Sequence, residues 1–234
     1  YKVLGAVWTA RNEGRKAVYW LETNDADFRE ISAVDYIDRN GNLKRLRWEK
    51  ETGGLSCGHV MVDRQLIRLL TIFFEDLTST EFTPALRELA FEVYREGREL
   101  GEAARELAEA LFPFEELEIF DPRDKGFRTY CRKMLLSLFE KTAPGEQCPG
   151  FIDDRGIRRA VFRGETGYRL RHGMPVNVDE YPLLPNVVTR PLCQDAWFAT
   201  SAYIAGPGEM AYLEPLKDLY LEYGVKRPRL IPRM

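Results

Sequence analysis

A glycine–proline–glycine turn near the C-terminus constrains the fold of this chain more than any other feature. Gly206-Pro207-Gly208-Glu209 closes an apolar run, and Gly224 supplies a later helix C-cap. The apolar residues between them recur at helical spacing: Met210, Leu213, Leu216, Leu219, Tyr220 and Tyr223. The pattern predicts a strand or short buried helix over Ala196–Ala205 that leads into an amphipathic helix, which Pro215 should bend or restart.

The start of that helix is a candidate anion site. The first backbone N–H groups of a helix have no partner within it, and its dipole favours negative charge there. Two plainer interpretations remain open: the turn reverses the chain and does nothing else, or Glu209 forms a capping box.

Polar side chains lie just upstream in the same apolar stretch. Arg190 follows an expected strand, Asn186–Thr189, and its guanidinium suits a carboxylate or phosphate; a salt bridge to a neighbour explains it equally well. Gln194 and Asp195 are harder to dismiss, because burying an unpaired amide and carboxylate is costly. We therefore expect them to contact a ligand or a neighbouring loop.

The first strand of the chain also leads into polar residues. Ala17–Leu21 has the continuous apolar pattern of a strand buried on both faces, and an acidic loop with Asn24, Asp25 and Asp27 follows it. Sites in α/β proteins form outside the carboxyl ends of strands. The two carboxylates are candidates for orienting an amine or for general-base work, with helix capping as the alternative.

The remaining segments alternate between strands and helices. They are a helix Tyr1–Arg11, a hairpin Ile31–Ile37 and Leu43–Trp48, long helices Val62–Leu77 and Thr83–Phe112, a strand Leu117–Phe120, a helix Phe127–Phe139, a hairpin Gly150–Ile152 and Ile157–Phe162, an irregular segment Asp179–Pro185 and a strand Arg229–Ile231. Recurrent strand–loop–helix units predict an α/β fold with a parallel sheet. Asp121 and Asp124 follow one of these strands, so they and the groups at Asp25 and Arg190 should share one sheet edge.

Composition excludes several functions. A net charge of −3 gives no basic field for nucleic acid, and no apolar run approaches the ~20 residues that span a membrane. Four cysteines without a C-x-x-C motif favour free thiols in the cytoplasm. Only two histidines are present, so we predict no metal site and no histidine-centred triad.

The C-terminal motif resembles a signature of the bacterial bacillithiol biosynthesis cysteine-adding enzymes. The matching positions are Asn186, Val187, Arg190, Pro191, Gln194, Asp195, Gly206, Pro207, Glu209 and Tyr212. Tyr1-Lys2, the VYWLETNDADFREI segment and the IFDPRD turn resemble other parts of that family in the same order. The similarity therefore covers most of the chain.

The resemblance implies a Rossmann-like core with inserted segments and a ligase that joins cysteine to the amino group of glucosaminyl-malate, with ATP or ADP as a possible cofactor. It divides the chain into a first core part with a hairpin insertion (1–61), a helical insertion (62–112) and the rest of the core (113–234). It assigns catalysis to Asp25, Asp27, Gln194 and Asp195. It assigns substrate binding to Asn24, Asn186, Arg190, Gly206, Pro207, Gly208, Glu209, Tyr212, Tyr1 and Lys2.

Departures from the family pattern leave open a function other than catalysis. The family's acidic loop usually reads Glu-Asp-His-Asp, whereas this chain has Asn24-Asp25-Ala26-Asp27 and so lacks the imidazole. We expect a fragment, because the family's phosphate loop before Tyr1 and its dimerising coiled coil after Met234 are not in the sequence, and the region near Glu146 looks short. A divergent module that binds a sugar or an anion without efficient catalysis is the alternative, and a structural subunit completed by another chain is a third possibility.

Overall fold

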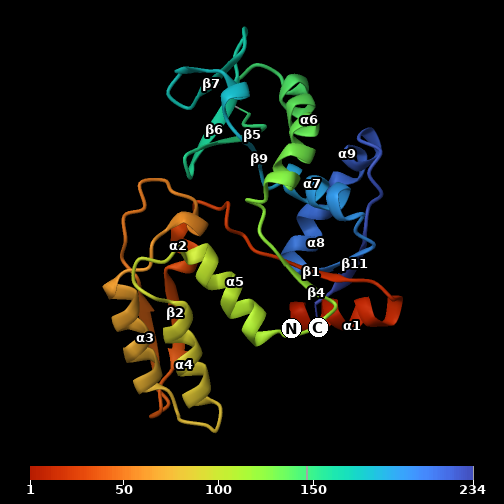
Figure 1. The fold of residues 1–234 in the computed structure, drawn as a ribbon. Coiled ribbons are helices and arrows are strands. Elements are labelled where there is room, and N and C mark those ends of the chain that lie inside the picture. Colours follow the sequence, from red (N-terminus) through yellow and green to blue (C-terminus); the bar gives the residue numbers. More distant parts are fainter. Residues whose placement is uncertain (146, 234) are drawn as a thin grey trace. The chain divides into compact units, whose positions relative to one another are not determined.

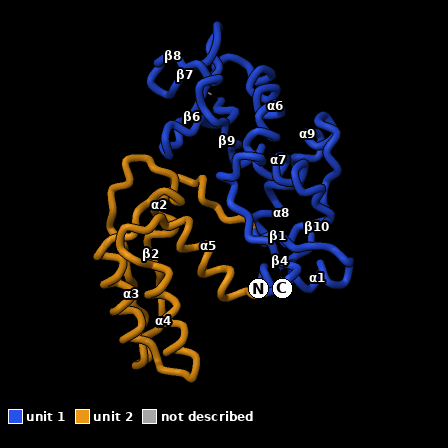
Figure 2. Tube along the Cα trace, in the orientation of Figure 1, with its two compact units in different colours: residues 1–19, 114–234 blue, residues 20–113 orange. Residues whose placement is uncertain are grey.

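The computed structural model describes residues 1–145 and 147–233, so the expectations about Glu146 and Met234 fall outside it. The chain forms two compact units (Figure 2): unit 1 holds residues 1–19 and 114–234, and unit 2 holds residues 20–113. The division expected from the sequence groups the first hairpin with the core. In the structure that hairpin and the acidic loop belong to unit 2, together with the helices that follow them.

The α/β part of unit 1 is built from two strand pairs and one helix (Figure 1). Strand β1 (Ala17–Trp20) pairs with β4 (Leu117–Phe120), and β10 (Ala202–Ala205) runs parallel to β11 (Arg229–Pro232). Helix α1 (Lys2–Glu13) packs Val7 and Ala10 against Ala17, and its Gly5 lies against Ile204 of β10. The α/β character is confirmed, but the described strands pair in separate pieces and not as one continuous sheet.

A five-stranded antiparallel sheet follows in unit 1, in the order β8-β7-β6-β5-β9. Its strands are β5 (Gly150–Asp154), β6 (Ile157–Arg163), β7 (Tyr168–Leu170), β8 (Pro175–Val176) and β9 (Leu183–Pro185). The hairpin of β5 and β6 is confirmed, with Arg155 and Gly156 at positive φ in its turn. Strands β7 and β8 were not expected, and β9 lies in a segment expected to be irregular, because strands of two or three residues leave no periodic signal.

Helices complete unit 1. Helix α6 (Lys125–Lys141) packs Phe139 beside Tyr168 of the sheet, with ring centroids 5.9 Å apart. The C-terminal segment forms α7 (Thr189–Phe198), α8 (Pro207–Leu213), a 3₁₀ turn η3 (Glu214–Leu216) and α9 (Lys217–Glu222). The helix start at Pro207 and the restart at Pro215 are confirmed.

One expectation about this segment is wrong. Asn186–Thr189 is not a strand, because the Asn186 Oδ1 atom accepts the backbone N–H groups of Val188 and Thr189, each at 2.9 Å, and turns the chain into α7. Arg190, Gln194 and Asp195 therefore lie on a helix and not at a strand end. The Ala196–Ala205 segment contains the end of α7 and strand β10.

Unit 2 combines a hairpin with three longer helices. Its elements are α2 (Phe28–Ile31), β2 (Ala33–Ile37), β3 (Leu43–Arg47), a 3₁₀ turn η1 (Cys57–His59), α3 (Arg64–Asp76), α4 (Thr83–Val93) and α5 (Leu100–Leu111). The hairpin is confirmed, with Gly41 at φ 83° in its turn. Phe28, Trp48, Cys57 and Val60 form one buried core cluster of this unit.

The single helix expected over Thr83–Phe112 is wrong: it breaks between Val93 and Leu100. Gly97, at φ 81°, donates its N–H to the carbonyl of Val62 at 2.9 Å, and the N–H of Leu100 bonds to Val60 at 2.8 Å. These contacts with a distant segment replace helical bonds. No helix in the described part of the chain is long and apolar enough to cross a membrane.

Candidate functional site

Glu209 is the centre of a polar cluster in unit 1. Its Oε2 atom accepts the N–H of Gly206 at 2.7 Å and forms an ion pair with the ammonium of Lys2 in α1. Its Oε1 atom accepts the hydroxyl of Tyr203 at 3.3 Å. The capping interaction that the sequence left open is therefore present. It occupies the backbone N–H of Gly206, one of the groups that the predicted anion site would use.

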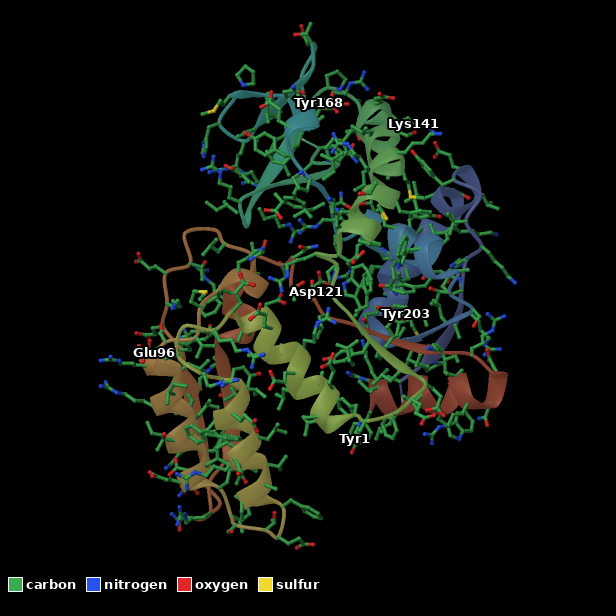
Figure 3. The ribbon with its side chains drawn as sticks, in the orientation of Figure 1. Tyr1, Glu96, Asp121, Lys141, Tyr168 and Tyr203 are labelled. Carbon is green, nitrogen blue, oxygen red and sulfur yellow. The ribbon has the colours of Figure 1, made fainter. Side chains whose placement is uncertain are left out.

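Electrostatics fix the protonation states in this cluster. Burial alone would raise the pKa of Glu209, but the Lys2 ammonium, the Gly206 N–H and the Tyr203 hydroxyl outweigh it and lower that pKa. Burial, together with nearby Glu209 and Tyr212, raises the pKa of Tyr203 above its usual range. At neutral pH Glu209 is thus a carboxylate and Tyr203 a neutral phenol. Figure 3 labels Tyr203 on β10.

Helix α7 brings Arg190 to the same region. The Arg190 Nη2 atom donates to the hydroxyl of Tyr212 in α8 at 3.5 Å, and its charge also acts on Tyr203. Gln194 follows Arg190 by one helical turn, so the two side chains share a half-buried face of α7. This face offers a cation and an amide, the groups that recognise carboxylates.

Asp195 lies on a different face of α7. It is 3 % exposed, and its Oδ2 atom accepts the hydroxyl of Tyr220 in α9 at 2.5 Å. Burial raises the pKa of Asp195 to about 6, a shift that the hydroxyls of Tyr220 and Thr200 partly oppose. Asp195 therefore faces the interior while Gln194 does not.

In unit 2 the acidic loop shows the capping arrangement that the sequence left open. Asp27 caps α2 by accepting the N–H of Arg29 at 3.1 Å, and Asp25 accepts the N–H of Asp27 at 3.1 Å. Backbone bonds tie the loop to η1: the N–H of Cys57 bonds to Asp25 at 2.6 Å. Asn24 is buried in this loop.

The same unit holds a histidine that was not among the predicted site residues. The Nδ1 atom of His59 in η1 lies 3.0 Å from the Oε1 atom of Glu99. A carboxylate on one ring nitrogen orients an imidazole for proton transfer. The two residues are 40 positions apart, so no local pattern could reveal the pair. The neighbouring Cys57 is no nucleophile at neutral pH, since burial and then Asp25 raise its pKa to about 11.

The two aspartates after β4 have structural roles in unit 1. Asp124 caps α6 by accepting the N–H of Phe127 at 2.7 Å. The Oδ2 atom of Asp121, labelled in Figure 3, accepts Nη2 of Arg123 at 2.8 Å. In the described ranges no group of three or more acidic, histidine or cysteine side chains is placed to hold a metal ion.

The structure brings together only part of the predicted site. Five residues of unit 1 form one network: Lys2, Arg190, Tyr203, Glu209 and Tyr212. Tyr203 was not predicted; its signal was a tyrosine six residues before Glu209, next to the Gly-Pro turn. Asp25 and Asp27 belong to unit 2, so a cleft that they share with Arg190 remains a prediction. Tyr1, Pro207 and Gly208 are exposed.

Comparison with known proteins gives related sequences along the whole chain. A "Putative cysteine ligase BshC" of Halalkalibacterium halodurans is 27% identical, with all of this chain and 51% of the relative covered. A protein of the same name in Salinibacter ruber is 27% identical over 92% of this chain and 46% of the relative. Another, in Flavobacterium johnsoniae, is 28% identical over 92% of this chain and 45% of the relative. The chain spans about half the length of the curated relatives that it matches.

A family model covers most of the chain. It is described as "Bacillithiol biosynthesis BshC, N-terminal Rossmann-like domain" and matches residues 1–148 and 176–234. The unmatched residues 149–175 contain strands β5, β6 and β7, whereas all the residues of the Glu209 network lie in the matched ranges. The chain therefore belongs to the BshC family of bacillithiol biosynthesis, of which it carries the N-terminal Rossmann-like domain.

Proposed function

We propose that this chain is the Rossmann-like part of a ligase that adds cysteine to the amino group of glucosaminyl-malate. The observation that carries the proposal is the network of Lys2, Arg190, Tyr203, Glu209 and Tyr212, which lies within the residues matched by the BshC family. The name of the relatives, cysteine ligase, supports the reaction class.

Each group has a role in the proposed reaction. Arg190 and Gln194 hold a carboxylate of the malate part, because they share a half-buried face of α7. Glu209 orients the amino group of glucosaminyl-malate. Its side chain remains ionised, because Lys2 and Gly206 stabilise its negative charge. In unit 2, Asp25 and Asp27 hold a substrate amine, and Asn24 supports their loop. Asn186 positions Arg190 by bending the chain into α7.

The cofactor, partners and compartment belong to the same proposal. Formation of an amide from a carboxylate needs activation, for which ATP or ADP-linked chemistry is the proposed source. A homodimer formed through segments outside this chain is the proposed assembly. The cytoplasm is the proposed compartment, and the four cysteines, all unpaired in the structure, support it.

An assay of the full-length protein with cysteine, ATP and glucosaminyl-malate tests the function. We expect slow but measurable amide formation, because the acidic loop has Ala26 where the resembling family has histidine. General acid–base groups contribute about 10²–10⁴-fold in rate, so Ala26→His should raise turnover if that imidazole matters. Glu30→His, at an exposed position of the short helix α2 that follows the loop, controls for adding a histidine nearby.

The outcomes separate the candidates. Robust wild-type turnover that Ala26→His leaves unchanged supports the ligase and shows that the loop histidine is dispensable. Binding of glucosaminyl-malate without turnover in either form supports the divergent binding module, which the capping roles of Asp25 and Asp27 favour. A folded protein that binds neither cysteine nor the sugar–malate would contradict both.

A further inference from the structure

Helix α7 presents two different polar faces. Arg190 and Gln194 occupy a half-buried face, whereas Asp195 is turned inward and is 3 % exposed. Asp195 lies one turn after Pro191, and both line a small interior cavity. One helix thus carries both a candidate ligand-binding face and a buried carboxyl. A contact that holds the buried carboxyl in place therefore also holds the ligand-binding face in place.

The buried carboxyl connects α7 to α9. The hydroxyl of Tyr220 donates to Asp195 Oδ2 at 2.5 Å, and the Tyr220 ring belongs to a core cluster with Leu192, Leu213 and Leu216. Leu192 comes from α7 and Leu213 from α8, so the cluster joins all three C-terminal helices. In a core packed this closely, a displaced α7 would move Arg190 away from Tyr212.

The cavity beside Asp195 is too small for a substrate. Its volume is about 10 Å³, which is room for about one water molecule. Its polar lining is Asp195, Tyr203, Tyr220 and Arg227. No described group meets hydrogen-bond geometry at the buried Oδ1 atom of Asp195, although the Thr200 hydroxyl lies near enough to the carboxylate to lower its pKa.

We propose that Asp195 is a positioning residue and not a catalytic one: with Tyr220 it holds α7 in the place that lets Arg190 and Gln194 bind a carboxylate. This inference rests on the proposed function for the identity of that carboxylate. Asp195, predicted from the sequence to be catalytic, thus acts through the position of α7, and Tyr220 joins the residues that affect binding.

The titration of Asp195 gives the proposal a pH signature. The groups that face it are Tyr220 of α9, Thr200 before β10, and Tyr203 and Arg227 across the cavity. The tyrosines stay neutral, because burial raises the pKa of both above the usual range. Protonation weakens Asp195 as an acceptor for the Tyr220 hydroxyl, so affinity for the carboxylate should fall as the pH drops through about 6.

The test compares Asp195→Asn, Tyr220→Phe and the double variant of the full-length protein. Tyr223→Phe is the matched control, because that phenol lies 3.2 Å from Ser137 and not beside Asp195. We expect each of the two single variants to weaken glucosaminyl-malate binding, measured by calorimetry and as KM, about tenfold. The double variant should lose no more than either single one, and kcat should change little. The pH dependence of binding near pH 6 should disappear in Asp195→Asn.

Two results would overturn the proposal. If Asp195→Asn lowers kcat by 10²–10⁴-fold while Tyr220→Phe behaves as wild type, Asp195 takes part in the chemistry. If neither variant changes ligand binding or the amide hydrogen exchange of residues 189–198, the contact between Asp195 and Tyr220 does not hold α7 in position. Should the wild type neither bind nor react, the proposed function fails, and hydrogen exchange still decides the inference: faster exchange in both variants but not in Tyr223→Phe supports it.

Discussion

At the scale of single residues, Glu209 combines a structural and a proposed chemical task. Its carboxylate caps α8 through Gly206 and pairs with Lys2, 207 positions away. Glu209→Ala should lower the free energy of unfolding by about 1–2 kcal/mol, since it removes both contacts. Glu209→Gln keeps the cap and should cost less. Urea denaturation measures both, with Glu214→Gln on the exposed surface as the control; equal losses in Ala and Gln variants would show that the cap contributes nothing.

Asp195 gives a second prediction at this scale. Its pKa is raised from 3.8 to about 6 in the folded state, so folding takes up a proton between those values. The contribution of this protonation to folding stability is complete below the pKa that Asp195 has in the unfolded chain, and it is lost as the pH rises through about 6. It amounts to about 3 kcal/mol at most.

Thermal unfolding of Asp195→Asn should therefore lack this component of the pH dependence. Its stability relative to wild type should be highest at pH 7.5 and should fall as the pH is lowered to 4.5. Asp218→Asn, on the exposed side of α9, is the control for removing a carboxylate from the surface. If the stability of wild type and of Asp195→Asn changed with pH in parallel, the Asp195 carboxyl would not be the titrating group.

At the scale of elements, two glycines test how closely helices and strands pack. A Cβ atom on Gly150 of β5 would lie 2.7 Å from the Phe139 ring of α6 and 2.8 Å from the Leu184 carbonyl of β9. Gly150→Ala should therefore destabilise the protein by about 1–3 kcal/mol.

Gly5 of α1 is the matched control, because its Cβ would meet Ile204 at an ordinary 3.8 Å. Gly5→Ala should stabilise the helix by about 0.5–1 kcal/mol, so the two alanine variants should shift the melting temperature in opposite directions. A loss in both would show that α1 packs on β10 more tightly than this distance indicates.

At the scale of the whole molecule, unit 2 is one continuous segment and unit 1 is not. Unit 2 has its own buried core of Phe28, Trp48, Cys57 and Val60. The fragment 20–113 should therefore unfold cooperatively by itself, as followed by circular dichroism. The fragment 114–234 should not, because residues 1–19 supply Val7, Ala10 and Ala17 to its core. Cooperative unfolding of 114–234 alone would contradict this division of the molecule.

The sequence by itself determined the features that depend on neighbouring residues. Gly41 and Gly156 mark hairpin turns, and Pro215 restarts a helix, because backbone preferences act over a few positions. The ordered motif from Asn186 to Tyr212, together with the matching segments before it, indicated the family that the comparison confirms, because such motifs depend on residue identity and spacing alone.

Only the tertiary structure decided which groups meet. Strands β7 to β9 are too short to carry a period, and pairing with neighbours makes them strands. The contacts of Gly97 break an otherwise helical pattern, and a packed core turns Asp195 inward while Gln194 stays half-buried. The Lys2–Glu209 and His59–Glu99 pairs join residues far apart in the chain. Burial and long-range pairing are properties of the folded chain, because they depend on partners that no local window of sequence contains.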